Sequence, residues 1–474
     1  FQPGNTTVDD FTTVVVDNSR MDALGREGYE LTVDRSSVRL TAATQTGIFY
    51  GKRTLEQLMT DKGIPCVRVS DRPRFAYRGM HMDVSRHFFP KSQVLKMLDE
   101  MARYKLNVFH FHLTDNGGWR IRIDKYPRLT AEGAFRTQRD WYAWWDRNDR
   151  RYLPEGTPGA YGGYFTKEDI REIVTYAAER HITVIPEIEF PAHSDAVFIG
   201  YPELCCTGKP YTTGEFCVGN EQVYTFMEDV LTEVMELFPS KYIHIGGDEV
   251  HYGNQSWFTD PEIQQFIKDK GLQNETGLEH YFVKRAADIV ASKGKTMIGW
   301  DEIIDAGVSP DKAIVMWWRH DRKHQLVKAL ENGYNVIMTP RRPFYADFVQ
   351  YGEHKVGRLW NGYNAIEDVY RFPEPIIHLT KDYEDQVMGL QFSLWTERVA
   401  DEKRLDFMTF PRLVAVAEDG WTPAKAKECS LFMKKLPVFL QYLDSLGIYY
   451  FNPFDPASTP EPNAPEKEDV LQNG

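Results

Sequence analysis

Two adjacent carboxylates follow an apolar stretch near the middle of the chain. Residues 242–245 are rich in β-branched and aromatic types and predict a strand, which Gly246 and Gly247 interrupt before Asp248 and Glu249. Glycine weakens a strand unless the chain must bend or another group must approach the backbone closely. Adjacent acids repel each other, so one of them should have a raised pKa. A neutral acid beside a charged carboxylate is the pair that general acid catalysis requires.

The composition narrows the range of partners. The chain has 474 residues and a net charge of −13, which argues against nucleic acids and anionic membranes as partners. It contains no apolar run of the ~18 residues that would span a membrane. It starts at Phe1 without a signal peptide, and we expect an exported protein (periplasmic, cell-surface or secreted) whose signal is absent from this chain. The five cysteines lack metal-binding spacing, and Cys206 and Cys217 either form a bridge or remain free thiols.

Alternating strands and helices must position the acidic pair. Residues 1–70 predict a small α+β domain, with half-buried strands at 29–33 and 37–41 and a helix at 46–59. Strands are then expected at 75–84, 107–113, 182–190, 242–250, 296–303, 313–318, 335–339 and 387–395, and a last helix at 406–417. About eight strand–helix units predict a (β/α)8 TIM barrel over residues 71–454, followed by a Pro/Glu-rich tail at 455–474. The alternative is an open doubly wound sheet, although no Gly-x-Gly-x-x-Gly opens a helix.

Two long connections carry many aromatic residues. The segment 115–165 contains four tryptophans, and the segment 341–386 contains Phe344, Tyr345, Tyr351 and Trp360. Long loops in compact domains are usually functional or disordered, and disordered segments contain few aromatic residues. We therefore expect these two segments to form the walls of a pocket.

Polar and aromatic residues gather where the predicted strands end, which is the catalytic face of a barrel. Aromatic rings can cover the apolar face of a sugar, and charged groups can bind its hydroxyls in pairs. A metal site is less favoured, because His193 and His244 lack a second ligand at a typical spacing. The residues at these strand ends are Asp83, Arg86, Asp115, Glu189, His193, Asp248, Glu249, Trp300, Trp318, Tyr345, Asp347, Trp395 and Glu397.

Several of these segments resemble the family-20 glycoside hydrolases, the β-N-acetylhexosaminidases. The motif His-x-Gly-Gly-Asp-Glu is the most specific and stands at residues 244–249. The supporting segments are Arg78-Gly79, Asp83-x-Ser85-Arg86-His87, His112-Leu113-Thr114-Asp115, Pro191-Ala192-His193, Gly299-Trp300, Trp318-Arg319 and Leu394-Trp395-Thr396-Glu397. The resemblance covers residues 72–421, and residues 1–70 look like part of the small domain that precedes the barrel in this family.

The resemblance implies an exo-acting hydrolase that removes terminal β-linked GlcNAc or GalNAc, with retention of configuration and without a cofactor or metal. The 2-acetamido group of the substrate would act as nucleophile and form an oxazolinium, an exception to the two-carboxylate scheme. Glu249 would be the general acid and base, kept protonated with the help of the Asp248 charge. Asp248 would orient the acetamido N–H. The expected partner is an oligosaccharide or glycoconjugate.

The resemblance also implies roles for the remaining residues. Tyr345 would bond the acetamido oxygen, and Trp300, Trp318 and Trp395 would enclose the acetyl methyl group. Arg86 would bind the 3- and 4-hydroxyls, and Asp347 and Glu397 the 4- and 6-hydroxyls. The supporting residues behind the acid would be Asp115, His193 and His244.

One departure and three alternatives accompany this interpretation. Asn116 stands where many relatives carry a second aspartate, which affects the hydrogen bonds that support the acid. A lacto-N-biosidase-type member of the same family would release a disaccharide. An ordinary retaining glycosidase would use Glu249 as acid and Glu397 as nucleophile. A glycan-binding protein on an inactive barrel would bind sugar without turnover.

Overall fold

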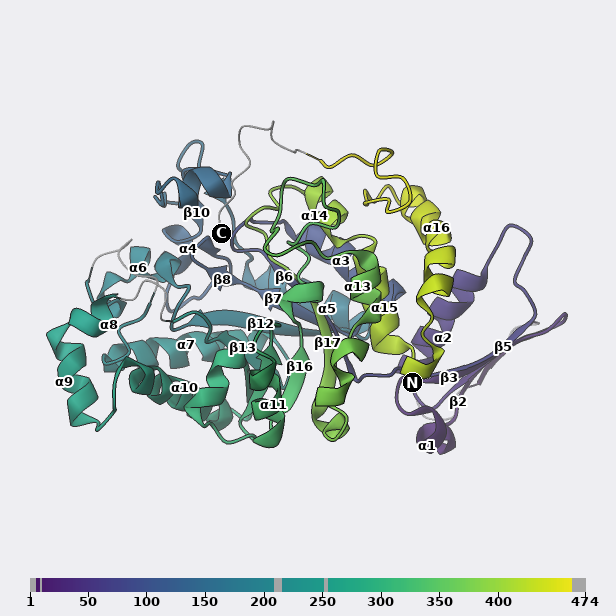
Figure 1. The fold of residues 1–474 in the computed structure, drawn as a ribbon, viewed down its shortest axis with the longest axis horizontal. Coiled ribbons are helices and arrows are strands. Elements are labelled where there is room, and N and C mark those ends of the chain that lie inside the picture. The colour runs from purple at the N-terminus through teal and green to yellow at the C-terminus, as the bar shows by residue number, and fades with distance from the viewer. Residues whose placement is uncertain (1–5, 9–10, 209–214, 251–254, 463–474) are drawn as a thin grey trace.

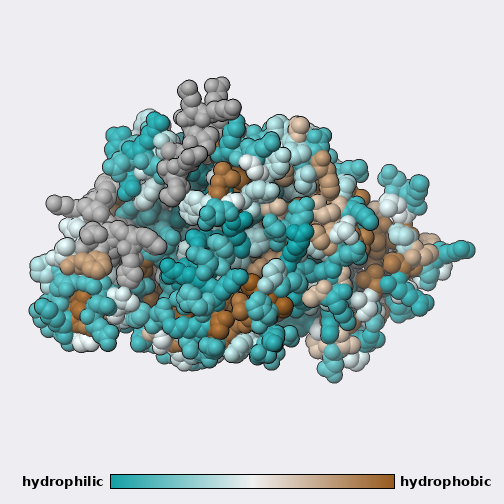
Figure 2. Space-filling model, viewed as in Figure 1, coloured by the Kyte–Doolittle hydropathy of each residue, from teal (hydrophilic) through white to brown (hydrophobic). Residues whose placement is uncertain are grey.

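The structure is a computed structural model that describes residues 6–8, 11–208, 215–250 and 255–462. A small sheet with a helix against it lies at one end of the molecule, beside a larger barrel surrounded by helices (Figure 1). The face seen in Figure 2 is mainly hydrophilic, with small separate hydrophobic areas. Within the described residues, no helix is long and apolar enough to cross a membrane.

The N-terminal part is a five-stranded sheet in the order β1-β2-β4-β3-β5. Its elements are β1 (Thr6–Val8), β2 (Thr12–Val16), α1 (Met21–Leu24), β3 (Tyr29–Val33), β4 (Val38–Ala42), α2 (Gln45–Leu58) and β5 (Val67–Asp71). Buried and half-buried residues alternate along β3, as the sequence pattern predicts for a sheet with one covered face. The side chains of Tyr29, Tyr50 and Trp421 pack together, which joins this sheet to the barrel.

Eight parallel strands close into a barrel in the order β12-β13-β14-β15-β16-β17-β6-β7. These strands are β6 (Tyr77–Asp83), β7 (Val108–His112), β12 (Thr183–Phe190), β13 (Tyr242–Gly246), β14 (Thr296–Trp300), β15 (Ala313–Trp317), β16 (Asn335–Met338) and β17 (Val387–Leu394). Every strand pairs with a neighbour on both sides. The prediction of a (β/α)8 TIM barrel preceded by a small α+β domain is confirmed, and the open-sheet alternative is wrong.

Amphipathic helices cover the outside of the barrel. They are α3 (Lys91–Arg103), α5 (Lys167–Glu179), α7 (Glu221–Leu237), α10 (Glu275–Ser292), α11 (Lys323–Glu331), α13 (Ile366–Arg371), α14 (Glu402–Thr409), α15 (Arg412–Trp421) and α16 (Cys429–Ser445). Helix α5 begins with a capping box, in which Thr166 and Asp169 each accept a hydrogen bond from the other's backbone N–H. The buried residues of these helices form one large core with the outward-facing residues of the strands.

Shorter elements form the loops. They are β8 (Thr114–Asp115), β9 (Gly118–Trp119), α4 (Arg128–Ala131), β10 (Phe135–Arg136), β11 (Tyr161–Gly162), α6 (Asp195–Gly200), α8 (Gln255–Thr259), α9 (Pro261–Asp269) and α12 (Arg341–Phe344). Trp119 and Trp144 of segment 115–165 are buried in the core, so these two tryptophans do not contribute to the pocket walls expected of that segment. Ring contacts and the Arg136 guanidinium hold Trp144 against Trp141.

The end of the barrel differs from its prediction in two places. The helix predicted at 406–417 is two helices, α14 and α15, because Pro411 cannot continue a helix and its predecessor Phe410 is extended. Helix α16 was not predicted, and it contains Pro437, a residue that normally breaks a helical pattern. The domain limits at residues 70 and 454 stay predictions. Beyond the second limit, Glu461 pairs with the buried Arg404.

Candidate active site

Strand β13 ends in a sharp bend that presents the two acids. Gly246 and Gly247 have φ values of 71° and 87°, in the left-handed region that favours glycine, and Glu249 follows at φ 54°. A Cβ on Gly246 would lie 1.8 Å from the Glu189 carboxylate. The register between β12 and β13 also shifts at Glu189, which places that side chain over the glycine. The predicted close approach to the glycine backbone is thus real, and Glu189 makes it.

Asp248 and Glu249 both face the imidazole of His193. The His193 Nε2 atom lies 3.6 Å from Asp248 Oδ2 and 3.3 Å from Glu249 Oε2. The Asp248 side chain is 13% exposed and that of Glu249 is 41% exposed. The two acids therefore share one cationic partner but differ in their access to water.

The acid with the raised pKa is Asp248. Burial and the charge of Glu249 raise the pKa of Asp248 to about 6, although His193 opposes the shift. Burial would also raise the pKa of Glu249, but His193, Arg358 and Arg86 outweigh it and lower that pKa. The prediction that one member has a raised pKa is confirmed. Its assignment to Glu249 is wrong for this structure, because Glu249 has three cations around it.

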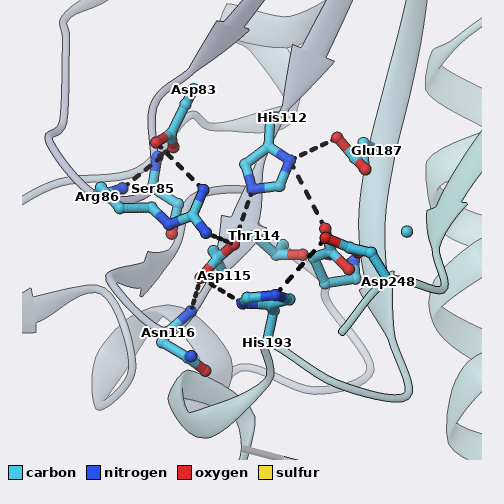
Figure 3. Close-up of polar contacts among 12 residues, drawn as sticks. Asp83, Ser85, Arg86, His112, Thr114, Asp115, Asn116, Glu187, His193 and Asp248 are labelled. Atoms are coloured by element: carbon cyan, nitrogen blue, oxygen red, sulfur yellow. Dashed lines mark hydrogen bonds and ion pairs between the residues drawn. The ribbon is translucent and has the colours of Figure 1, made fainter. Parts of the chain in front are cut away.

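Asp115 lies behind His193 and also binds Arg86. Its carboxylate oxygens lie 3.4 Å from His193 Nδ1 and 2.6 Å from an Arg86 terminal nitrogen. A second Arg86 nitrogen lies 3.4 Å from Asp83 (Figure 3), and the guanidinium stacks 4.9 Å from the Trp395 ring centroid. Burial opposes the negative charge of Asp115, but Arg86 and His193 hold its pKa well below the usual range. Asp115 is thus a fixed anion between two cations.

Asn116 makes its own contacts next to Asp115. Its backbone N–H donates to Asp115 at 2.6 Å, and its side-chain oxygen accepts a bond of 3.1 Å from the N–H of Asp195, the first residue of α6. Its carbonyl accepts a bond from the Tyr152 hydroxyl. The departure from the family pattern therefore still supports the Asp115 carboxylate, through the backbone.

Three tryptophans and a tyrosine form a buried box beside the acids. Trp300 and Trp395 have ring centroids 5.7 Å apart, and Trp395 lies 5.9 Å from Tyr345. Tyr345 stacks on Trp318 at 6.3 Å. These four side chains are between 1% and 8% exposed. The structure thus brings Trp300, Trp318, Trp395 and Tyr345 together as a contiguous aromatic surface.

A cation that the sequence analysis missed joins two of the predicted sugar-binding acids. Arg358 lies 2.5 Å from Asp347 and 2.8 Å from Glu397. Burial and the Glu397 charge raise the pKa of Asp347 to about 6, against the opposing effect of Arg358. Burial opposes the charge of Glu397, but Arg86 and Arg358 lower its pKa. Arg358 lies within the long segment 341–386 and not at the end of a predicted strand, so the sequence pattern did not identify it.

His244 does not touch the acidic pair. Its Nδ1 atom lies 2.9 Å from Glu187, a fully buried glutamate inside the barrel that also contacts His110 and His112. His244 lacks a second ligand at a typical sequence spacing, but the fold brings residues of other strands that could be ligands close to it. Among the described residues, His110, Glu187 and His244 form one of four clusters whose potential ligand atoms lie within 4.8 Å of each other, and His193, Asp248 and Glu249 form another. In both clusters the groups pair directly with one another.

Glu187 was not among the residues predicted at the strand ends, and Glu189 and His112 were named there or in the family motifs without a role in the site. Strands β7 and β12 carry polar residues at alternate positions, His110 and His112 in one and Glu187 and Glu189 in the other. Alternate residues of a barrel strand point inward, so this period of two within apolar strands was the available signal. Burial and Asp248 raise the pKa of Glu189 well above its usual range, which makes it a neutral neighbour of the acidic pair.

Comparison with known proteins identifies the family of the chain. The pattern described as "Glycosyl hydrolase family 20, catalytic domain" matches residues 75–424, and "Glycosyl hydrolase family 20, domain 2" matches residues 2–72. A beta-hexosaminidase of Porphyromonas gingivalis is 37% identical over 451 residues, which cover 91% of this chain and 55% of that relative. The chain thus spans about half the length of this relative.

Two solved structures are similar over nearly the whole chain. The GH20 exo beta-N-acetylglucosaminidase of Vibrio harveyi in complex with N-acetylglucosamine has a TM-score of 0.83 at 27% identity, covering 96% of this chain and 78% of that one. A mutant beta-hexosaminidase of Streptomyces plicatus in complex with its product GlcNAc has a TM-score of 0.79 at 32% identity, covering 94% and 86%. Since the catalytic-domain pattern alone covers most of the sequence, the chain belongs to glycosyl hydrolase family 20.

Proposed function

We propose that the chain is an exo-acting β-N-acetylhexosaminidase, which releases terminal β-linked GlcNAc or GalNAc from glycans with retention of configuration. The observation that carries this proposal is the buried box of Trp300, Trp318, Trp395 and Tyr345 beside Asp248. A small apolar group with one polar neighbour fits such a box, and the acetamido group of an N-acetylhexosamine has this chemistry.

The acetamido oxygen would be the nucleophile. It attacks C1 while the bond from C1 to the glycosidic oxygen breaks, and Glu249 gives its proton to that leaving oxygen. The resulting oxazolinium is opened by water, whose proton returns to Glu249. Asp248 accepts a hydrogen bond from the acetamido N–H and offsets the positive charge that develops on the ring. The aromatic box keeps water away from this reactive intermediate.

Substrate binding would also place the proton correctly. The two acids interact strongly, so protons bind to the pair rather than to either residue alone. An N–H donor next to Asp248 favours its ionised form. The Asp248 charge then raises the proton affinity of Glu249, which becomes the general acid. The proton must pass from Asp248, whose pKa is raised to about 6, to Glu249, whose pKa is lowered, and the hydrogen bond from the acetamido N–H would supply the stabilisation for this exchange.

Three charged residues would bind the sugar hydroxyls. Arg86 would hold the 3- and 4-hydroxyls, and Asp347 and Glu397 the 4- and 6-hydroxyls. The pairing of Arg358 with both carboxylates supports this role, because it fixes their positions and leaves further lone pairs for the sugar. The names of the relatives, beta-hexosaminidase and exo beta-N-acetylglucosaminidase, support the same substrate class.

A matched pair of substrates tests the proposal. We expect hydrolysis of 4-nitrophenyl β-N-acetylglucosaminide and at least ~10³-fold lower kcat/KM for 4-nitrophenyl β-glucoside, because the latter lacks the internal nucleophile and uses only the acid. Equal rates would favour the ordinary retaining mechanism with Glu397 as nucleophile. Release of disaccharides from defined oligosaccharides would favour the lacto-N-biosidase-type alternative. Sugar binding without turnover, unchanged in Glu249→Gln, would favour an inactive barrel.

A further inference from the structure

A fully buried glutamate lies inside the barrel, where the inward-facing positions carry both apolar and histidine side chains. Glu187 is 0% exposed, and the neighbouring inward positions include Ile185, Ile298, Ile314 and Ile337. A buried carboxylate is strongly disfavoured unless it is paired and hydrogen-bonded. The carboxylate therefore requires partners among the buried polar side chains, and the identity of those partners indicates its role.

Four imidazoles and one indole surround this carboxylate. The distances to Glu187 are 2.5 Å from His112, 2.9 Å from His244, 3.0 Å from His110, 3.8 Å from His81 and 2.9 Å from the Trp300 indole nitrogen. Burial opposes the charge of Glu187, but His244, His112 and His110 lower its pKa well below the usual range. Glu187 is therefore a buried anion that contacts several imidazole rings and one indole ring simultaneously.

His112 connects Glu187 to Asp115 in the active site. Its Nδ1 lies 2.5 Å from Glu187, and its Nε2 lies 3.1 Å from Asp115. An imidazole can donate from both nitrogens only when it is protonated. Burial opposes that charge, but Glu187 and Asp115 raise the pKa of His112 to about 10. His112 is thus a cation between two anions.

The contacts form an unbroken chain from the barrel interior to the proposed general acid. Glu187, His112, Asp115 and His193 follow one another in Figure 3, and the His193 ring ends 3.3 Å from Glu249. The charges alternate in sign along it. A second contact runs from Glu187 to the indole N–H of Trp300, in the aromatic box.

We infer that Glu187 is a positioning residue that orients both halves of the active site. It orients the acid through His112, Asp115 and His193, and it orients the acetyl-binding surface through Trp300. This inference rests on the proposed function. Loss of the Glu187 charge would leave His112 without its stronger partner and would loosen the orientation of His193 towards Glu249. Protonation of the leaving oxygen would then be impaired.

The variant Glu187→Gln tests this role. Glutamine can still accept the Trp300 N–H but removes the charge. We expect kcat/KM for 4-methoxyphenyl β-N-acetylglucosaminide, a poor leaving group, to fall about 10- to 100-fold, within the range for general acid catalysis. The 2,4-dinitrophenyl glycoside leaves without a proton, so its kcat/KM should change by less than about 3-fold. A merely structural role would reduce both values equally.

A double variant shows whether the loss of the Glu187 charge acts through the series of contacts from Glu187 through His112 and Asp115 to His193. Asp115→Asn interrupts the same path, so adding Glu187→Gln to it should not change the ratio of the two kcat/KM values further. Tyr224→Phe is the matched control, because its buried hydroxyl donates to the Val218 carbonyl at helix α7, outside the barrel interior, and its ratio should equal that of the wild type.

Three results would overturn the inference. They are equal losses on both substrates, multiplicative effects in the double variant, or an unchanged ratio in folded Glu187→Gln. If that variant does not fold, nitrogen NMR of histidine-labelled wild-type protein decides, because His112 should keep both nitrogens protonated through pH 8, and a neutral ring there would exclude the role. Failure of the proposed function gives a different result, because wild-type protein would then hydrolyse neither the 4-methoxyphenyl nor the 2,4-dinitrophenyl β-N-acetylglucosaminide.

Discussion

At the scale of single residues, the surroundings of Asp248 and Glu249 shift their pKa values in opposite directions. Glu249 faces His193 and lies under the influence of Arg358 and Arg86, which together lower its pKa. Asp248 is more deeply buried, and its pKa rises to about 6. Neighbouring carboxyls whose pKa values are pushed apart in this way can take different roles in one reaction. The sequence predicts such a division, but its direction depends on cations from distant segments.

The pH dependence of the reaction follows from Asp248. Because the pair must hold one proton, which passes from Asp248 to Glu249 when the acetamido N–H binds, we expect kcat/KM to fall as the pH rises through about 6, where Asp248 loses that proton. Asp248→Asn should lower kcat/KM about 10²- to 10³-fold, the scale for one preorganised stabilising group, and should remove this limb near pH 6, because residue 248 then holds no titrating proton. The measurement is kcat/KM between pH 4 and 8. Asp288→Asn, on the outer surface of α10, should keep the limb, and near wild-type activity of Asp248→Asn would contradict the role.

The sequence predicts the residues at strand ends better than those within strands. Asp115, His193 and Arg86 were expected near the acid, and the structure brings them together. Glu187 was missed because its partners come from several different strands, and sequence distance does not indicate which inward-facing residues meet. Arg358 was missed because a long loop gives no periodicity from which to place a side chain.

At the scale of elements, a bulge and a bend cooperate at the end of two strands. The register shift in β12 places Glu189 over Gly246, and the positive φ values of Gly246 and Gly247 turn β13 towards His193. Bulges often re-aim side chains next to active sites. The double glycine is therefore explained by a neighbouring carboxyl group as well as by backbone conformation.

Alanine substitutions separate these two causes. Both glycines have left-handed φ values, so alanine at either position carries about 1–2 kcal/mol of backbone strain. Only Gly246→Ala also collides with a buried carboxyl group, since its Cβ would lie 1.8 Å from Glu189, whereas that of Gly247 meets Ile303 at 3.0 Å. We expect kcat/KM to fall at least ~10-fold more in Gly246→Ala than in Gly247→Ala, which corresponds to ~1.4 kcal/mol. Equal losses would mean that backbone strain alone matters.

Alternation of strands and helices was sufficient to predict the barrel. Each strand was expected within a few residues of its observed limits, because buried parallel strands are continuous apolar runs. Helix α16 was missed, since Pro437 lies within a pattern that is otherwise apolar and helical. Its buried residues, Phe432, Leu436, Leu440 and Leu443, recur at helical spacing and pack onto the barrel core. Tertiary packing of these residues therefore outweighs the helix-breaking tendency of Pro437.

At the scale of the whole molecule, a buried ion pair joins the N-terminal sheet to the barrel. The Arg78 guanidinium of β6 donates two hydrogen bonds, of 2.8 and 3.0 Å, to Glu27, which lies between α1 and β3. It also stacks 5.1 Å from the Trp421 ring, which packs against the sheet. The exposed fractions of the Arg78 and Glu27 side chains are 1% and 18%. The junction thus combines a bidentate charged pair with an aromatic contact.

This junction should contribute to stability without taking part in catalysis. Glu27→Gln leaves Arg78 buried without its counter-charge, a change that costs about 3 kcal/mol in buried pairs. We therefore expect a lower Tm by calorimetry and an unchanged kcat/KM at 25 °C, because Arg78 and Asp83 are separated by about 16 Å along β6. Asp288→Asn removes an exposed pair with Lys312, and its effect on Tm should be negligible. A loss of activity in folded Glu27→Gln, or a Tm equal to that of the control, would show that the two parts are coupled in another way.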